Sequence, residues 1–414
     1  MIGLADCNNF FVSCERAVDP SLEGVPVVVL SNNDGCAISR SNEAKRMGVK
    51  MGQPAFQLRD LVQNGKLITL SGNHILYRNI SLRIHDIFRR YVPATIDYSV
   101  DEAFLDMDGI PTERLAEIGE AIVNICLAEE HIPVTIGFAP TKTLAKIATE
   151  TGKKGGHSVV VLSDPAMINN VISAMPIADL WGVGRRLTKR LYLTGIHTIG
   201  DFAASPLPRI RAMLGINGER TWLELHGEPC ISLDHVDRQI QDSISETRTF
   251  PVDIDDFDYL RARIAIYCAH VSKRLRAMHA LCSFIRVFLY TNRFHTENGF
   301  HTLDKTAEFD IPTHDAAVIS QTGIKLLADI FNPMLQYKRA GVVLSGISPA
   351  SISPSLFELP AQREIRLNRE RLMHAVDSLN DGAGPHVVKL ASQLTKGHIG
   401  HNDGYSSSFG APSI

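Results

Sequence analysis

The sequence predicts a multidomain protein of mixed α/β and α+β class. Its 414 residues, 44% of them hydrophobic, are enough to bury several separate cores. Short apolar runs first alternate with segments of helical periodicity, which is typical of sheets covered by helices. The pattern becomes wholly helical between Met175 and Pro229, then returns to helices and alternating strands over 243–345. These changes of pattern indicate separate folding units.

The first part of the chain is predicted to contain a small α/β unit. Two apolar runs, Ile2–Ala5 and Val25–Leu30, predict buried strands. A further strand is expected over 36–40 and a short helix over 42–47, which Gly48 ends.

The segment that follows predicts a second set of alternating elements. Apolar residues recur at helical spacing up to Tyr91, and Pro93 closes that helix. We expect these strands to form a mixed sheet. The predicted elements are a helix over 75–91, two strands over 96–107, a helix over 115–128, a strand over 134–138 and a helix over 141–150. A last helical patch is expected over 368–379, within a poorly packed tail.

Bulk properties exclude several classes of protein. No apolar run approaches the roughly 20 residues of a membrane span, and Asp6 interrupts the first one, so a cytoplasmic protein is expected. The seven cysteines include no CxxC pair and no zinc-ligand spacing, which favours reduced thiols. A formal net charge of −3 argues against a simple basic DNA-binding protein.

A basic segment nevertheless lies between Trp181 and Arg220, where seven basic residues stand against two acidic ones. At its start, Gly182 and Gly184 form a GVG turn, in which backbone N–H groups can approach a phosphate at a helix start. A third glycine and the strand–turn–helix setting of a dinucleotide-binding site are missing, so that class of site is excluded.

Three carboxylates are the candidate catalytic residues. Asp6 follows the first strand, and Asp101 and Glu102 lie at the turn between two later strands. If these strands are neighbours in one sheet, the three carboxylates lie close together. Clustered carboxylate oxygens are suitable ligands for Mg²⁺. Two such ions about 3.5–4 Å apart stabilise the attacking and leaving oxygens of a phosphoryl transfer. Alternatively, Asp6 is a turn residue and the acidic pair is solvated.

Four segments together resemble the motifs of the Y-family translesion DNA polymerases. They are DCNNFFVSCE at 6–15, SNEAKRMGVKMG at 41–52, YSVDEAF at 98–104 and PTKTLAKIA at 140–148. The resemblance continues through DLWGVGRRLTKRL and LMHAVDSLN and covers nearly the whole chain. It implies a DNA-directed DNA polymerase shaped like a right hand, which carries out error-prone synthesis in SOS mutagenesis. The implied domains are a palm at 1–20 and 76–166, fingers at 21–75, a helix-hairpin-helix thumb at 167–230, a linker at 231–242, a little finger at 243–345 and a tail at 346–414.

The resemblance assigns roles to individual residues. Asp6 and Asp101 are expected to bridge two Mg²⁺ ions, Glu102 completes the ion at the primer hydroxyl, and the backbone carbonyl of Cys7 binds the other. Phe11 matches the steric gate, an aromatic ring that collides with a ribose 2′-hydroxyl; alternatively it is a core residue.

The nucleotide contacts follow the same motifs. Ile38 is expected to roof the nascent base pair, and the residues expected at the triphosphate are Ser39, Lys45 and Lys153. Asn42 departs from the family pattern, because many relatives place a phosphate-contacting Tyr there.

Duplex contacts are expected from two regions. The GVG turn and the arginines after it match the thumb element, and basic residues of the third unit match the little finger. That unit is nearly neutral, with twelve basic and eleven acidic residues over 243–345, so its charges must be one-sided. The residues concerned are Gly182, Gly184, Arg185, Arg186, Arg248, Arg274 and Arg286.

The resemblance also implies partners besides primed template DNA and dNTP. A processed UmuD-like dimer and RecA are expected. The segment SPSLF resembles a sliding-clamp-binding peptide ending in Leu356 and Phe357, although Ser353 stands where Gln is expected. Two other functions stay open: a catalytically silent DNA-binding scaffold and, with less support, a nucleotidyl cyclase.

Overall fold

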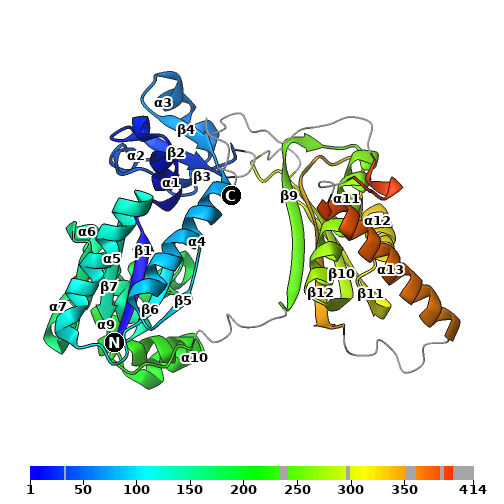
Figure 1. Ribbon diagram of the computed structural model, residues 1–414. Helices are drawn as coiled ribbons and strands as arrows, with labels where there is room; N and C mark the ends of the chain where they lie inside the picture. Colours follow the sequence, from blue (N-terminus) through cyan, green and yellow to red (C-terminus); the bar gives the residue numbers. More distant parts are fainter. Residues whose placement is uncertain (32–33, 233–240, 295–298, 351–359, 383–386, 395–414) are drawn as a thin grey trace. The chain divides into compact units, whose positions relative to one another are not determined.

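The computed structural model describes residues 1–31, 34–232, 241–294, 299–350, 360–382 and 387–394. The described residues divide into two compact units, one ending before the segment 233–240 and the other beginning after it (Figure 1). The candidate catalytic carboxylates all belong to the first unit.

A five-stranded mixed sheet is the centre of the first unit. Its strand order is β5-β6-β1-β7-β8, and only β7 and β8 pair in parallel. This confirms the predicted mixed sheet. The strands are β1 (Ile2–Cys7), β5 (Ala94–Asp97), β6 (Glu102–Asp106), β7 (Val134–Ala139) and β8 (Val159–Val161).

Helices cover both faces of this sheet. Alternation along β1 sends Ala5 and Cys7 into one core and Leu4 into another. The first core contains apolar residues of α1 (Phe10–Val18), α4 (His74–Tyr91) and α5 (Leu115–Glu130). The second contains residues of α6 (Lys142–Gly155) and of the helical segment that follows it.

The segment of chain between α1 and α4 forms a smaller sheet. Its order is β3-β2-β4, and its core includes Val28, Leu30 and Ala37. Its elements are β2 (Val27–Leu30), β3 (Ala37–Arg40), β4 (Ile68–Ser71), α2 (Asn42–Arg46) and α3 (Arg59–Gln63). The short helix at 42–46 begins at Ser41, whose hydroxyl accepts a hydrogen bond from Ala44 N.

The helical segment predicted after Met175 is present and begins earlier. It consists of α7 (Pro165–Ala174), α8 (Arg185–Leu193), α9 (Ile199–Ala204) and α10 (Leu207–Leu225). Glu224 in α10 is fully buried and accepts hydrogen bonds from the backbone N–H groups of Thr143, Cys230 and Ile231. This carboxylate therefore joins the helical segment to the start of α6.

The second unit is a four-stranded antiparallel sheet covered by helices, which confirms the predicted α+β class. The strand order is β11-β10-β12-β9. The elements are β9 (Ser243–Ile254), α11 (Phe257–Ala277), β10 (Ala280–Thr291), β11 (Thr302–Thr313), α12 (Ala316–Ile330), β12 (Tyr337–Pro349) and α13 (Pro360–Gly382).

Two helices extend beyond their predicted ends. Helix α6 continues through the GKKGG segment, and Gly156 (φ 74°) caps it in the left-handed region. Helix α13 is about twice as long as predicted and packs against the second unit through buried Met373 and an Arg276–Asp377 ion pair of 2.6 Å. The expectation of a poorly packed tail is therefore wrong for α13.

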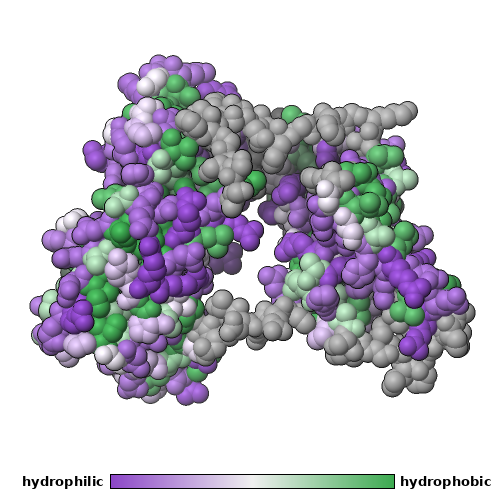
Figure 2. Space-filling model, viewed as in Figure 1, coloured by the Kyte–Doolittle hydropathy of each residue, from purple (hydrophilic) through white to green (hydrophobic). Residues whose placement is uncertain are grey.

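No described helix is long and apolar enough to cross a membrane. The face drawn in Figure 2 mixes hydrophilic and hydrophobic residues over both units. Such mixing is ordinary for protein surfaces, so single exposed apolar residues carry no functional argument.

Helix α6 approaches the sheet unusually closely. A Cβ atom on Gly137 of β7 would lie 2.3 Å from the backbone N of Thr149 and 2.6 Å from the carbonyl oxygen of Ala145. The hydroxyl of Thr149 donates to the carbonyl of Leu4 in β1 at 3.0 Å. Gly137 thus permits the helix–sheet distance on which the position of α6 depends.

We expect Gly137→Ala to lower the free energy of unfolding by at least about 2 kcal/mol, because the added methyl group overlaps backbone atoms. Chemical denaturation followed by circular dichroism measures this. Gly382→Ala is the control, because a Cβ there meets no atom within 4 Å. Equal stability of the two variants would contradict the close approach.

Candidate active site

Two of the three predicted carboxylates face each other on adjacent strands. Asp6 of β1 pairs in register with Glu102, the first residue of β6. Directly opposed residues in an antiparallel pair point to the same face. This is the face covered by α6, because Leu4 and Phe104, two residues away on each strand, belong to the core that contains α6.

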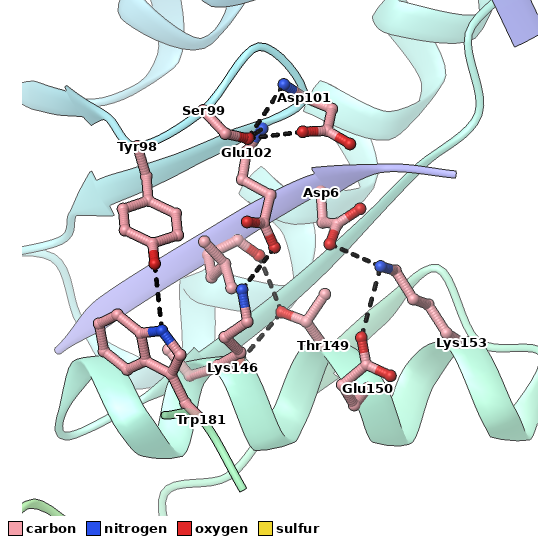
Figure 3. Close-up of polar contacts among 12 residues, drawn as sticks. Asp6, Tyr98, Ser99, Asp101, Glu102, Lys146, Thr149, Glu150, Lys153 and Trp181 are labelled. Atoms are coloured by element: carbon pink, nitrogen blue, oxygen red, sulfur yellow. Dashed lines mark hydrogen bonds and ion pairs between the residues drawn. The ribbon is translucent and has the colours of Figure 1, made fainter. Parts of the chain in front are cut away.

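The third carboxylate does not join them. Asp101 precedes β6, and its Oδ1 accepts a hydrogen bond from the Ser99 hydroxyl at 2.5 Å, while its carbonyl oxygen accepts one from Cys7 N at 2.9 Å. In Figure 3 its carboxylate is hydrogen-bonded to the Ser99 hydroxyl. Among the described residues, no three His, Cys, Asp or Glu side chains form a group that could hold a metal ion.

Two lysines of α6 pair with the two opposed carboxylates. Lys146 Nζ donates to Glu102 Oε1 at 2.7 Å, and Lys153 Nζ lies 2.5 Å from Asp6 Oδ2 (Figure 3). Lys146 and Lys153 are seven residues apart, which is two helical turns, so they lie on the same face of α6. All four side chains are mostly buried.

This environment shifts the pKa values of the two carboxylates in opposite directions. Burial raises the pKa of Asp6 to about 7; the charge of Lys153 opposes this rise, and a hydrogen bond with Glu102 adds to it. Burial also raises the pKa of Glu102, but hydrogen bonds from Asp6 and Lys146 lower it more, to below its usual value. Asp6 therefore gains and loses its proton near neutral pH, while Glu102 stays ionised there.

The predicted steric gate lies on a rigid aromatic support. Phe11 in the first turn of α1 stacks on Tyr77 of α4, with ring centroids 4.5 Å apart and planes 17° apart. The Tyr77 hydroxyl donates to Glu15 Oε1 at 2.5 Å, and Glu15 is only 2% exposed. Phe11 is half-buried and packs against the first core, so the steric gate and the core residue both stay possible interpretations.

Three of the predicted nucleotide residues lie on β3 and α2: Ile38, Ser39 and Lys45. Ser39 is buried, and its hydroxyl donates to the carbonyl of Asn9 at 3.2 Å; Ile38 is its neighbour on β3. The Asn42 side chain accepts a hydrogen bond from the Asn9 amide at 3.0 Å. Lys45 of α2 is largely exposed. Partial burial of its ammonium and then the charges of Arg40 and Lys153 lower its pKa.

The GVG turn has the geometry expected at a helix start. Gly182 adopts φ 84°, in the left-handed region, and Gly184 is the N-cap residue of α8. The side chains of Arg185 and Arg186, the first residues of α8, are exposed. The turn is therefore open to an anion at the N-terminus of α8.

The three predicted arginines of the second unit do not share one surface. Arg248 of β9 pairs with Ala340, a core residue, so it belongs to the helix-covered face of the sheet. Arg274 of α11 donates to the carbonyl of Ser245 on the same strand at 3.0 Å. Arg286 is out of phase with the core residues Ile285 and Val287 and belongs to the open face. Arg248 and Arg286 therefore lie on opposite faces of the sheet, and the duplex contacts of the three arginines stay a prediction.

Arg248 and Arg286 also form ion pairs, with Glu246 at 2.9 Å and Asp304 at 2.9 Å. The predicted clamp-binding segment, with Ser353, Leu356 and Phe357, lies outside the described residues, as does most of the predicted linker.

The sequence reasoning missed Lys146, Trp181 and Tyr77. Lys146 was recognisable as the residue seven positions before Lys153 within one predicted helix. Trp181 and Tyr77 had no local signal, because their partners are far away in the sequence: Trp181 contacts Tyr98, and Tyr77 contacts Phe11.

Known proteins resemble this chain over nearly its full length. Residues 5–150 match the impB/mucB/samB family, and residues 241–355 match the C-terminal domain of that family. Protein UmuC of Salmonella typhimurium strain LT2 is 34% identical over 398 residues, which cover 95% of this chain and 93% of that protein. The chain belongs to the impB/mucB/samB family.

The chain is also similar to other proteins over most of its length. Protein MucB of Escherichia coli is 31% identical over 92% of this chain and 90% of its own length. DNA polymerase IV of Pelotomaculum thermopropionicum is 29% identical over 95% of both chains. The predicted membership in the Y family, close to UmuC, is thereby confirmed for this impB/mucB/samB protein.

The fold agrees with this classification. A Y-family DNA polymerase chimera of Dbh and Dpo4 superposes with a TM-score of 0.69 at 22% identity, covering 84% of this chain and all of the chimera. The Dbh DNA polymerase in an insertion ternary complex gives a TM-score of 0.53 at 22% identity, with the same coverage. The impB/mucB/samB chain therefore has the Y-family polymerase fold.

We expect Tyr77→Phe to lower the free energy of unfolding by about 1–3 kcal/mol, because it leaves the buried Glu15 carboxylate without its hydroxyl donor. Thermal denaturation measures the change. Tyr91→Phe is the matched control, since Tyr91 ends the same helix and is 37% exposed. An equally small effect in both variants would show that the Tyr77–Glu15 bond contributes nothing.

Proposed function

We propose that this protein is a DNA-directed DNA polymerase that performs error-prone translesion synthesis in SOS mutagenesis. The observation that carries the proposal is the in-register pairing of Asp6 with Glu102 beside the lysines of α6, within a chain of the impB/mucB/samB family. Family membership supports polymerase chemistry in general. The positions of the carboxylates and lysines indicate which side chains would carry it out.

The donor set fits a divalent cation. Asp6 and Glu102 face each other on adjacent strands, and burial raises the pKa of Asp6 to about 7, so a cation beside them would stabilise the ionised form of Asp6. Hard oxygen ligands of this kind suit Mg²⁺. Asp101 would complete the set by turning its carboxylate away from Ser99, and the Cys7 carbonyl would add a backbone ligand. When bound, two Mg²⁺ ions would supply charge neutralisation for the attacking primer oxygen and the leaving pyrophosphate.

The lysines of the site would bind the negative charge of a nucleotide triphosphate. Lys153 lies beside Asp6, and Lys45 of α2 would contribute a second ammonium. Lys153 would have to exchange its ion pair with Asp6 for one with a phosphate oxygen. Ser39 would have to exchange its hydrogen bond to Asn9 for one to a phosphate oxygen.

Phe11 would select the sugar of the incoming nucleotide. Its ring is half-exposed and cannot retreat easily, because Tyr77 stacks against it. A 2′-hydroxyl would therefore meet a rigid surface, and deoxynucleotides would be favoured. Ile38, on the neighbouring strand β3, would lie over the base pair.

Primed duplex DNA would bind through the GVG turn and the arginines of α8, with further contacts from the second unit. A processed UmuD-like dimer, RecA and a sliding clamp are proposed partners, by analogy with the relatives. The scaffold and cyclase alternatives gain no support from a specific feature of the described residues.

We expect Mg²⁺-dependent extension of a labelled primer by the purified chain, tested alone and with UmuD-like and RecA partners. Asp101→Asn should reduce the rate at least about a hundredfold, because a neutral amide binds a hard cation poorly. Asp108→Asn is the control, since Asp108 lies beyond β6, away from the paired carboxylates. If parent and variant are both inactive under all conditions, the scaffold function is favoured instead.

We expect Phe11→Ala to raise ribonucleotide insertion relative to deoxynucleotide insertion by about tenfold or more, because the ring that opposes the 2′-hydroxyl is removed. Single-nucleotide kcat/KM values for a dNTP and the matching rNTP measure this. Phe56→Ala, at an exposed residue of the small sheet region, serves as the control. Unchanged discrimination in Phe11→Ala would reject the gate.

A further inference from the structure

A chain of contacts runs from the GVG turn to Glu102. Trp181, the residue before the turn, donates from Nε1 to the Tyr98 hydroxyl at 3.1 Å, and the two rings meet edge to face at 5.6 Å and 89°. Phe104 packs against both rings, 5.5 Å from Tyr98 and 6.0 Å from Trp181. We call Tyr98, Phe104 and Trp181 the aromatic clamp.

Lys146 lies between this clamp and the catalytic carboxylate. Its Nζ is 5.2 Å from the centre of the Tyr98 ring and 5.9 Å from that of Trp181, while it donates to Glu102 Oε1 at 2.7 Å (Figure 3). Both distances lie within the range of cation–π attraction. The flexible Lys146 side chain is thereby confined by rings on one side and a carboxylate on the other.

The clamp residues come from three separate segments of the first unit. Tyr98 follows β5, Phe104 lies in β6, and Trp181 precedes the turn that opens α8. The turn itself is short and fixed, since Val183 N donates to the carbonyl of buried Leu180 at 2.9 Å. A change in the position of the turn therefore moves the indole of Trp181 directly.

We propose that Trp181, Tyr98 and Lys146 are positioning residues that hold the Glu102 carboxylate in its working orientation and link it to the duplex-binding turn at Gly182–Gly184. This inference rests on the proposed polymerase function. Lys146 restrains Glu102, the clamp restrains Lys146, and the backbone that meets the DNA restrains the clamp.

The link predicts a particular kinetic defect. If Trp181 and Lys146 act through Glu102 and not by binding the duplex or the nucleotide, their loss leaves both affinities nearly unchanged. Loss of the restraint on Glu102 lowers the rate of the chemical step, which appears in kcat rather than in KM. A purely structural role would instead lower stability and both constants together.

The experiment compares variants in a Trp222→Phe background, which leaves Trp181 as the only tryptophan of the sequence. Trp181→Leu and Lys146→Met should each lower kcat about tenfold or more, with the Kd for a labelled primed duplex, from fluorescence anisotropy, changed by less than about twofold. Lys146→Arg, which keeps the charge, should restore part of the rate. Lys154→Met is the control, because Lys154 pairs with Asp179 on the surface of the same helix.

Two further readouts separate positioning from general damage. Tryptophan emission should change in Lys146→Met and not in Lys154→Met, without DNA or metal, because Lys146 lies over the Trp181 ring. The double variant Trp181→Leu/Lys146→Met should be no slower than about twice the slower single variant, since both act through one carboxylate. Trp181→Phe, which keeps a ring and loses the N–H donor, provides a milder variant if Trp181→Leu does not fold.

The outcomes are distinguishable. An active parent with unchanged kcat in Trp181→Leu and Lys146→Met, or with multiplicative defects in the double variant, overturns the link and leaves the polymerase function standing. A duplex Kd that weakens in parallel with kcat also overturns it, since Trp181 would then act in binding. A parent that is inactive under all conditions overturns the polymerase function, and the link with it.

Discussion

The close packing of α6 on β1 and β7 is the constraint on which the site depends. It is possible because Gly137 leaves room for the backbone of α6, and the Thr149 hydroxyl fixes the helix to β1. At this distance Lys146 and Lys153 reach Glu102 and Asp6. A larger residue at 137 would move both ammonium groups away from the carboxylates together.

This packing brings together the charged groups that a phosphate-bearing substrate and a cation would contact. Two ammonium groups already oppose two carboxyls, and burial raises the pKa of one carboxyl, Asp6, to about 7. The carboxylates would accept a cation in place of the lysines, and the lysines would then pair with an anion. A divalent cation and a triphosphate satisfy those two conditions at once.

The candidate functional side chains are held in place by residues that are distant in the sequence. Phe11 is held by Tyr77, which is held in turn by the buried Glu15. Glu102 is held by Lys146, which the aromatic clamp confines. Each support joins two elements of the first unit, so the reactive groups keep their geometry although they lie at strand ends and turns.

The sequence by itself determined the fold class and most elements of the first unit, and it predicted the candidate catalytic carboxylates. Strands and helices were predictable because their apolar periodicities are local, and the family because its motifs are contiguous. Only the tertiary structure decided that Asp101 turns to Ser99, that Arg286 lies on a different face from Arg248, and that Trp181 reaches Tyr98. Rotamers, strand register and contacts across more than 80 residues depend on packing between segments, and no local sequence pattern records that packing.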